Sequence, residues 1–192
     1  MTTAGRCAVF LDRDGTINVE VSYLHRPADL KLIPGAVAAI RRLNLAGYVV
    51  VVVTNQAGIA RGLYGEADMH MLHAHLDTLL AAEGARLDAW YWCPHHPLFT
   101  GPCACRKPGT AMLEAAAADH GLDLGRSWLI GDSAGDIGAG EAAGCRTILV
   151  RTGYGAALET TLRAGHPGPH PEVVVDALPD AVDYLLEASD GR

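Results

Sequence analysis

The chain has 192 residues, of which 49% are hydrophobic and 19% are charged, and its net charge at pH 7 is -7. This length suits one α/β domain with a sizeable core, and the composition excludes a largely disordered chain. The acidic balance disfavours nucleic acid as a partner, because polyanion binding needs a basic surface. The longest apolar run, residues 48–53, is far shorter than the roughly 20 residues of a membrane-spanning helix.

Short β-branched runs alternate with alanine-rich segments along the chain. In chain order we predict a strand at 7–11, a helix at 35–45, a strand at 48–53, a helix at 65–83, a strand at 88–92, a helix at 110–120, a strand at 127–130, a helix at 136–143, strands at 147–150 and 173–175, and a helix at 179–187. This alternation predicts an α/β fold with a doubly wound, Rossmann-like parallel sheet, as a single domain over residues 1–192. No stretch between these elements is long enough for a large cap domain.

Polar clusters follow each of the first four predicted strands. Asp12 and Asp14 follow the first strand, the residues TNQ at 54–56 follow the second, CPH at 93–95 follow the third, and Asp132 follows the fourth. In doubly wound sheets, ligands bind beyond the carboxyl ends of the strands. The four clusters therefore predict one site on one edge of the sheet.

Several carboxylates converge in this predicted site. Residues two apart in an extended segment point the same way, so Asp12 and Asp14 can face one spot, and Asp132 and Asp136 arrive from a nearby strand end. Converging carboxylates repel one another unless a cation lies between them, and hard oxygen ligands suit Mg²⁺. The alternatives are that the first pair are solvated turn residues and that the second pair cap a helix.

The groups around the carboxylates are suited to phosphate. The Thr54 hydroxyl and the backbone N–H groups near Asn55 can donate to phosphate oxygens, and Lys107 in CRKPG supplies a positive charge. Each feature alone is typical of an ordinary turn. Together with the aspartates they predict a phosphoryl-transfer site.

Four potential zinc ligands lie within 13 residues, namely Cys93, His95, Cys103 and Cys105. Their number and type match a closed tetrahedral Zn²⁺ site, with His96 as a rival for the histidine position. The N-terminus lacks the features of a signal peptide, so we expect a cytoplasmic protein, in which crowded cysteines indicate a metal rather than a disulfide. Because four ligands leave no open position, we expect a structural zinc-binding loop that orients the adjacent Lys107.

The stretches FLDRDGTIN, VVTNQAGIARG, CRKPG and LIGDSAGD match, in order, the four motifs of the haloacid dehalogenase-like (HAD) phosphatases, which the chain resembles up to about residue 150. The resemblance implies that Asp12 is the nucleophile that forms an aspartyl-phosphate and that Asp14 is the general acid and base. It also implies that Thr54 and Lys107 hold the phosphoryl group. Asp132 would bind Mg²⁺ together with Asp12 and the backbone carbonyl of Asp14.

A zinc loop within such a phosphatase resembles two related groups, the D-glycero-D-manno-heptose 1,7-bisphosphate 7-phosphatases and the histidinol-phosphate phosphatases. TNQAGIARG and CPHHP favour the heptose group, which acts in nucleotide-activated heptose biosynthesis, whereas the short loop between His95 and Cys103 keeps the histidinol group open. The resemblance implies a small sugar phosphate as substrate. We also expect a monomer, although no sequence pattern determines the oligomeric state. The predicted substrate contacts are Arg13, Glu20, Tyr23, Asn55, Gln56, Arg106 and Ser133.

Two further functions remain open on the sequence. Without a cap, an open site could admit a macromolecule, as in a phosphatase of protein or nucleic-acid ends. A zinc-stabilised binding module on an inactive phosphatase scaffold would lack at least one motif residue, and none of these residues is missing.

Overall fold

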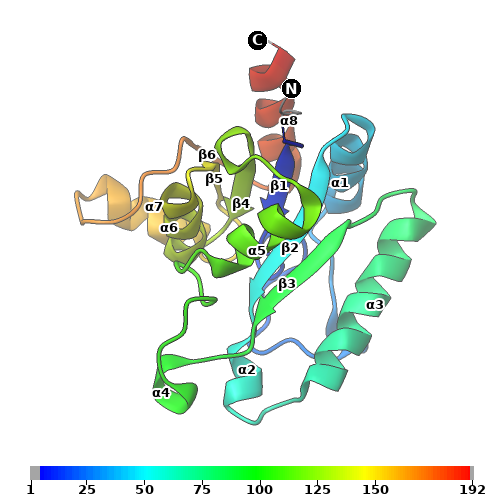
Figure 1. The fold of residues 1–192 in the computed structure, drawn as a ribbon, viewed down its shortest axis with the longest axis vertical. Coiled ribbons are helices and arrows are strands. Elements are labelled where there is room, and N and C mark those ends of the chain that lie inside the picture. Colours follow the sequence, from blue (N-terminus) through cyan, green and yellow to red (C-terminus); the bar gives the residue numbers. More distant parts are fainter. Residues whose placement is uncertain (1–4, 191–192) are drawn as a thin grey trace.

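A six-stranded parallel sheet forms the centre of the computed structural model, which describes residues 5–190 (Figure 1). The strands are β1 (Ala8–Leu11), β2 (Val49–Asn55), β3 (Ala89–Cys93), β4 (Trp128–Gly131), β5 (Arg146–Val150) and β6 (Val173–Val175). Their order is β3-β2-β1-β4-β5-β6, and all neighbours run parallel. The predicted doubly wound, Rossmann-like sheet is therefore confirmed.

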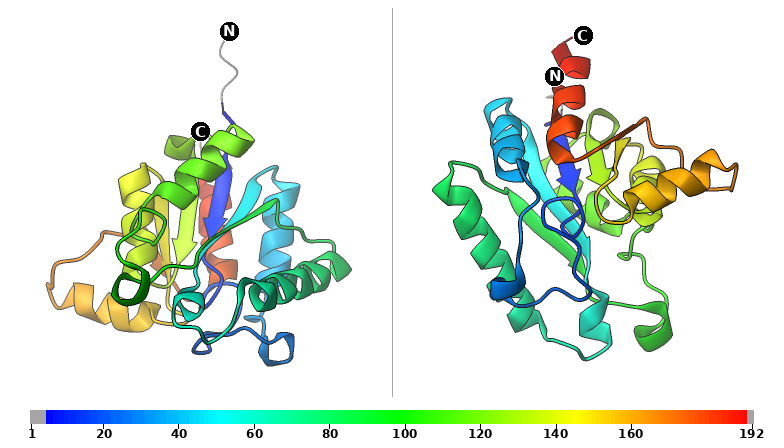
Figure 2. Two further views of the ribbon diagram at one scale, coloured as in Figure 1. Left: turned by 60° about the horizontal axis from the view of Figure 1, so that its bottom comes forward. Right: turned by 180° about the vertical axis from the view of Figure 1, so that it is seen from behind.

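Helices cover both faces of the sheet (Figure 2). One face carries α1 (Ala36–Leu45), α3 (Glu66–Ala82) and α8 (Leu178–Asp190), and the other carries α5 (Ala111–His120) and α6 (Ala134–Ala143). Shorter helices lie in the connections, namely α2 (Ala57–Ala60), α4 (Pro97–Thr100), α7 (Gly155–Arg163) and the 3-10 turns η1 (Pro27–Asp29) and η2 (Leu124–Arg126).

The two faces bury separate apolar clusters because successive side chains of a strand point to opposite sides. In β1, Val9 and Leu11 pack toward α1 and α8, whereas Ala8 and Phe10 pack toward α5. All four side chains are fully buried. The first polar groups after β1 therefore appear only at the carboxyl edge of the sheet.

The structure differs from the predicted elements mainly at α7, which the sequence analysis did not predict. This helix begins at a glycine, and no side chain caps its N-terminus, so the usual start signal is lacking. In contrast, α6 begins two residues earlier than predicted because Ser133 caps it.

Between β1 and α1, the chain forms only the short turn η1, in agreement with the predicted absence of a large cap domain. Among residues 5–190, no helix is both long and apolar enough to cross a bilayer.

Candidate active site

A cavity of about 330 Å³ opens at the carboxyl ends of β1, β2 and β4. The strand order reverses between β1 and β4, which is where doubly wound sheets bind ligands. The cavity is lined by Asp12, Asp14, Glu20, Val21, Ser22, Tyr23, Leu24, Thr54, Asn55, Gln56, Ala57, Arg61, Tyr64, His96, Arg106, Lys107, Asp132, Ser133, Asp136 and Tyr154. Most of the residues predicted from the sequence therefore meet at one place.

Three carboxylates gather at the floor of the cavity. Asp12, Asp132 and Asp136 each offer an oxygen within 4.8 Å of the other two, and all three side chains are largely buried. Burial raises the pKa of Asp12 to about 7, with a further contribution from the negative charge of Asp136. Burial, together with repulsion by Asp12 and Asp136, raises the pKa of Asp132 to about 8.

The ammonium of Lys107 lies among these carboxylates. Its Nζ is 2.7 Å from Asp12 Oδ1 and 2.5 Å from Asp136 Oδ1, and it donates to the Val53 carbonyl at 2.6 Å. Burial alone would lower the pKa of Lys107, but the two carboxylates outweigh it and hold the pKa above its usual value. One ammonium among three carboxylates leaves a surplus of negative oxygen donors, and that donor set fits a divalent cation such as Mg²⁺.

Two glycines let the backbone pack directly against Asp132. A Cβ atom on Gly153 would lie 1.9 Å from Asp132 Oδ2, and one on Gly15 would lie 2.1 Å from the same oxygen. Both residues also have positive φ, +58° and +80°. The backbone N–H of Tyr154 donates to Asp132 Oδ2 at 2.8 Å, so the orientation of this carboxylate is set by its surroundings.

Asn55, Ser133 and Asp136 position Lys107 and the start of α6. The Asn55 amide accepts from the Lys107 backbone N–H at 3.1 Å and donates to its carbonyl at 3.3 Å. Ser133 and Asp136 form a capping box, in which the Ser133 hydroxyl donates to Asp136 Oδ2 at 2.5 Å. The sequence placed Asp136 among the converging carboxylates but assigned it no catalytic or metal-binding role, because helix capping explains its position equally well. The structure shows that it both caps α6 and pairs with Lys107.

The outer wall of the cavity is polar and partly aromatic. Glu20 and Tyr154 face each other across the mouth, with the tyrosine hydroxyl 3.4 Å from Glu20 Oε1. Partial burial and the nearby Asp14 charge raise the pKa of Glu20. Arg61, which the sequence analysis did not include among the contacts, lies with its guanidinium 5.5 Å from the ring centre of Tyr23 and 5.0 Å from that of Phe99. This arrangement joins three loops around the cavity.

The side chain of Arg13 lies elsewhere than predicted. It is not among the residues that line the cavity, and its side chain is only 1% exposed. Its guanidinium instead pairs with Asp14 from behind, with Nη2 2.7 Å from Asp14 Oδ2. The structure therefore places Arg13 behind Asp14 and not among the residues that line the cavity. The other groups that hold the guanidinium, the Leu24 carbonyl and the His73 ring, come from other parts of the chain, so no local sequence pattern signals this arrangement.

The cysteine cluster is present, but without its predicted histidine. The sulfur atoms of Cys93 and Cys105 are 2.8 Å apart, and Cys103 lies 3.6 and 3.5 Å from them, too far for disulfides. Three thiols this close together form a candidate metal site. Within the described chain, the ring of His95 is not part of this group, whereas His96 caps α4 and lines the cavity.

Paired aspartates after the first strand of a doubly wound sheet, facing a buried lysine, place this chain among the HAD-like hydrolases. A HAD-hydrolase-like family model accordingly matches residues 104–181. The chain is 45% identical over 190 residues to a D-glycero-D-manno-heptose-1,7-bisphosphate 7-phosphatase of Thermosynechococcus vestitus, and the match covers 94% of this chain and 95% of that protein.

A D-glycero-beta-D-manno-heptose-1,7-bisphosphate 7-phosphatase of Pseudomonas aeruginosa is 39% identical over 95% of this chain and 99% of its own length. Among solved structures, a D,D-heptose 1,7-bisphosphate phosphatase of B. bronchiseptica in complex with magnesium and phosphate superimposes with a TM-score of 0.86 at 36% identity, covering 95% of this chain and 99% of that one. The chain belongs to the D-glycero-D-manno-heptose-1,7-bisphosphate 7-phosphatase family, which favours the heptose group over the histidinol group.

Proposed function

We propose that this enzyme removes the 7-phosphate of D-glycero-D-manno-heptose 1,7-bisphosphate. The observation that carries the proposal is the 2.7 Å contact between Lys107 Nζ and Asp12 Oδ1 beside Asp14, in a cavity that all three residues line. Identity to the heptose phosphatases over nearly the whole chain supports the choice of substrate.

In the proposed reaction, the Asp12 carboxylate attacks the phosphorus atom and the bond to the sugar oxygen breaks, which gives an aspartyl-phosphate. Asp14 donates a proton to the departing sugar alkoxide. Asp14 then takes a proton from water, which attacks the aspartyl-phosphate and releases phosphate and free Asp12. Two easier displacements replace one difficult one, and both proton transfers use the same side chain.

Asp12, Asp132 and the backbone carbonyl of Asp14 would hold Mg²⁺. When bound, the ion neutralises charge on the carboxylates and on the oxygens of the transferring phosphoryl group. Lys107 adds a second positive charge, and the Thr54 hydroxyl adds a donor. The magnesium and phosphate in the B. bronchiseptica relative support this part of the proposal.

The rest of the substrate would lie against the outer wall. Glu20, Tyr23 and Gln56 can hydrogen bond with sugar hydroxyls, with Ser133 at the inner edge of the same wall. Arg106 and Arg61, which line the same cavity, would bind the second phosphate of the bisphosphate.

The proposal includes one structural zinc ion on Cys93, Cys103 and Cys105. The spacing of His95 in the sequence makes it the candidate for the fourth ligand, although its ring lies outside the cluster in the structure. This loop runs from the end of β3 to Lys107, so a bound zinc would restrain the lysine. A cytoplasmic location and a monomeric state also belong to the proposal, and cell fractionation and size-exclusion chromatography test them.

Phosphate release from the heptose bisphosphate and from histidinol phosphate tests the choice of substrate. We expect kcat/KM to favour the heptose bisphosphate by more than about tenfold, or about 1.4 kcal/mol of transition-state binding. An equal or opposite preference would contradict the proposal.

Asp12→Asn tests the nucleophile. We expect turnover to fall below a few per cent without a loss of melting temperature, and beryllofluoride to form an adduct on Asp12 of the wild type only. Asp183→Asn is the matched control, because Asp183 is an exposed α8 residue paired with Arg42. Substantial turnover by Asp12→Asn would exclude the covalent route through this residue.

A further inference from the structure

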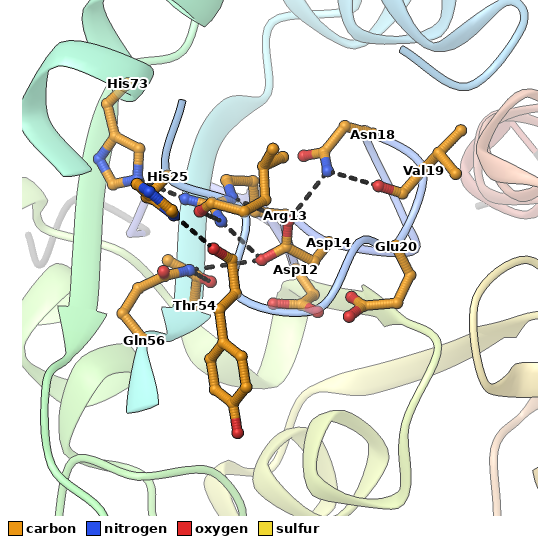
Figure 3. A network of polar contacts seen from close by, with 12 residues as sticks. Asp12, Arg13, Asp14, Asn18, Val19, Glu20, His25, Thr54, Gln56 and His73 are labelled. Carbon is orange, nitrogen blue, oxygen red and sulfur yellow. Dashed lines mark hydrogen bonds and ion pairs between the residues drawn. The ribbon is translucent and has the colours of Figure 1, made fainter. Parts of the chain in front are cut away.

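A buried guanidinium lies directly behind Asp14, on the side away from the cavity (Figure 3). Arg13 Nε donates to Asp14 Oδ1 at 3.1 Å, and Nη2 donates to Asp14 Oδ2 at 2.7 Å. Both oxygens of the carboxylate are thus held by one planar group. Such a two-point contact restricts rotation of the carboxylate as well as its position.

The remaining donors of Arg13 are also engaged. Nη2 reaches the Leu24 carbonyl at 3.2 Å, and Nη1 lies 3.2 Å from Nε2 of His73. The Gln56 side chain forms hydrogen bonds with its neighbours when its amide oxygen accepts from Arg13 Nη2, at 3.1 Å, and its amide nitrogen donates to the Tyr64 hydroxyl. The guanidinium is therefore fixed from several sides before it reaches Asp14.

His73 supports Arg13 as a neutral acceptor. A guanidinium has no acceptor, so the 3.2 Å contact requires an unprotonated Nε2 on the imidazole. Burial, together with the positive charge of Arg13, lowers the pKa of His73 to about 3, in agreement with a neutral ring. The ring stacks on Trp90, with centroids 3.8 Å apart, so it is itself held by β3.

Asp14 receives one more donor from the opposite side, since Asn18 Nδ2 lies 2.9 Å from Asp14 Oδ1 (Figure 3). The same amide group also donates to the Val19 carbonyl at 3.0 Å. Three N–H groups from two residues therefore surround a carboxylate whose open side faces the cavity.

We propose that Arg13, supported by His73, is a positioning residue that aims the Asp14 carboxyl group at the sugar oxygen of the substrate. This inference rests on the proposed function, in which Asp14 transfers the proton. A general acid must lie within hydrogen-bond distance of the atom that it protonates, and an error of about 1 Å can reduce the rate about 100-fold. Arg13 itself touches no substrate, because Asp14 lies between it and the cavity.

Arg13→Lys tests the proposal, because lysine keeps the charge but cannot form the two-point contact. We would measure kcat/KM, which reports the step that forms the aspartyl-phosphate, with two probes. Heptose bisphosphate releases an alkoxide that needs a proton, whereas p-nitrophenyl phosphate releases a stable phenolate that does not. We expect Arg13→Lys to lose at least about tenfold more on heptose bisphosphate than on p-nitrophenyl phosphate. Equal losses on the two probes, or no loss, would overturn the proposal.

Two controls separate this proposal from the proposed function. Asp14→Asn should show the same selective loss in larger degree. If Asp14→Asn loses the same fraction of kcat/KM on both probes, the proposed role of Asp14 as general acid is rejected. Selective loss in Asp14→Asn together with equal losses in Arg13→Lys rejects only the role of Arg13. Arg42→Lys, which changes an exposed arginine in the same way, should change neither value.

A second pair of variants decides the matter if Arg13→Lys does not fold. His73→Phe keeps a ring to stack on Trp90 but offers Arg13 no acceptor, whereas His73→Gln offers an amide oxygen. We expect a selective loss on heptose bisphosphate in His73→Phe and its recovery in His73→Gln. Equal losses on the two probes in His73→Phe would overturn the proposal, because the support of Arg13 would then have no effect on proton transfer.

Discussion

In the absence of Mg²⁺, Asp132→Asn should stabilise the protein, and the effect should grow with pH. The structure raises the pKa of Asp132 from an ordinary value of 3.8 to about 8 through burial and repulsion by Asp12 and Asp136. Between these two values the folded protein holds a proton that the unfolded chain has lost. Stability therefore falls as pH rises from about 4 to about 8 and levels off above that. Asparagine resembles the protonated acid and does not titrate.

The magnitude follows from the width of this window. Each pH unit inside it changes the free energy of unfolding by about 1.4 kcal/mol, so the advantage of Asp132→Asn should grow by about 3 kcal/mol between pH 5 and pH 7. For a chain of this length, that corresponds to a difference in melting temperature of about 6–12 °C. Because Asp12 and Asp132 repel each other, the pH dependence of this difference reports the titration of the pair and not of Asp132 alone.

The assay is thermal unfolding of the two proteins between pH 5 and pH 8 in magnesium-free buffer. The buffer contains no strong chelator, because a chelator could remove a metal ion from the cysteine loop. Adding Mg²⁺ should then stabilise the wild type much more than the variant, because a cation that binds the folded site shifts the unfolding equilibrium. A difference in stability that stays constant with pH would refute the reasoning. A difference that reverses in favour of the wild type as pH rises would refute it equally.

Two further substitutions test the zinc loop and the packing around Asp132. Cys103→Ser should lose the single zinc ion found by elemental analysis and lower stability by several kcal/mol, because metal binding contributes to folding. Cys7→Ser, which lies outside the cluster, should keep both the zinc ion and the stability of the wild type. Full activity in a zinc-free protein would contradict the structural role of the zinc ion. Gly153→Ala should reduce kcat/KM more than tenfold, because its Cβ would meet Asp132 Oδ2. Gly165 also has a positive φ, +80°, but nothing lies within 4 Å of its added Cβ atom. Gly165→Ala therefore isolates the backbone cost of about 1–2 kcal/mol and should leave activity unchanged. Equal activities in the two glycine variants would contradict the packing argument.

The position of the site was predictable from the sequence because it depends on local patterns. A fully apolar strand such as β1 can end only where the chain leaves the core, so Asp12 and Asp14 had to appear at the edge of the sheet. Parallel strands bring their carboxyl ends to the same edge, which places Asp132 and Lys107 near the first pair. The meeting of the four motifs at one edge of the sheet follows from this logic, whereas the order of the strands came only from the structure.

The directions of individual side chains were not predictable in the same way. Arg13 points into the protein because the carbonyl of Leu24, the imidazole of His73 and the amide of Gln56 surround it, and these groups come from distant parts of the chain. Asp136 pairs with Lys107 because β4 and the loop before α5 converge, whereas the sequence left open whether it joins the other carboxylates or caps a helix. The helix α7 lacks the local start signals on which sequence prediction depends.

The amino-acid sequence alone determined which chemical groups reach the edge of the sheet, since strand burial and turn chemistry are properties of short segments. Only the tertiary structure decided which of them face the cavity and which stand behind it. That choice depends on the pairing of buried charges contributed by segments far apart in the chain. An unpaired buried charge is costly, so the positions of distant partners determine where each charged side chain points.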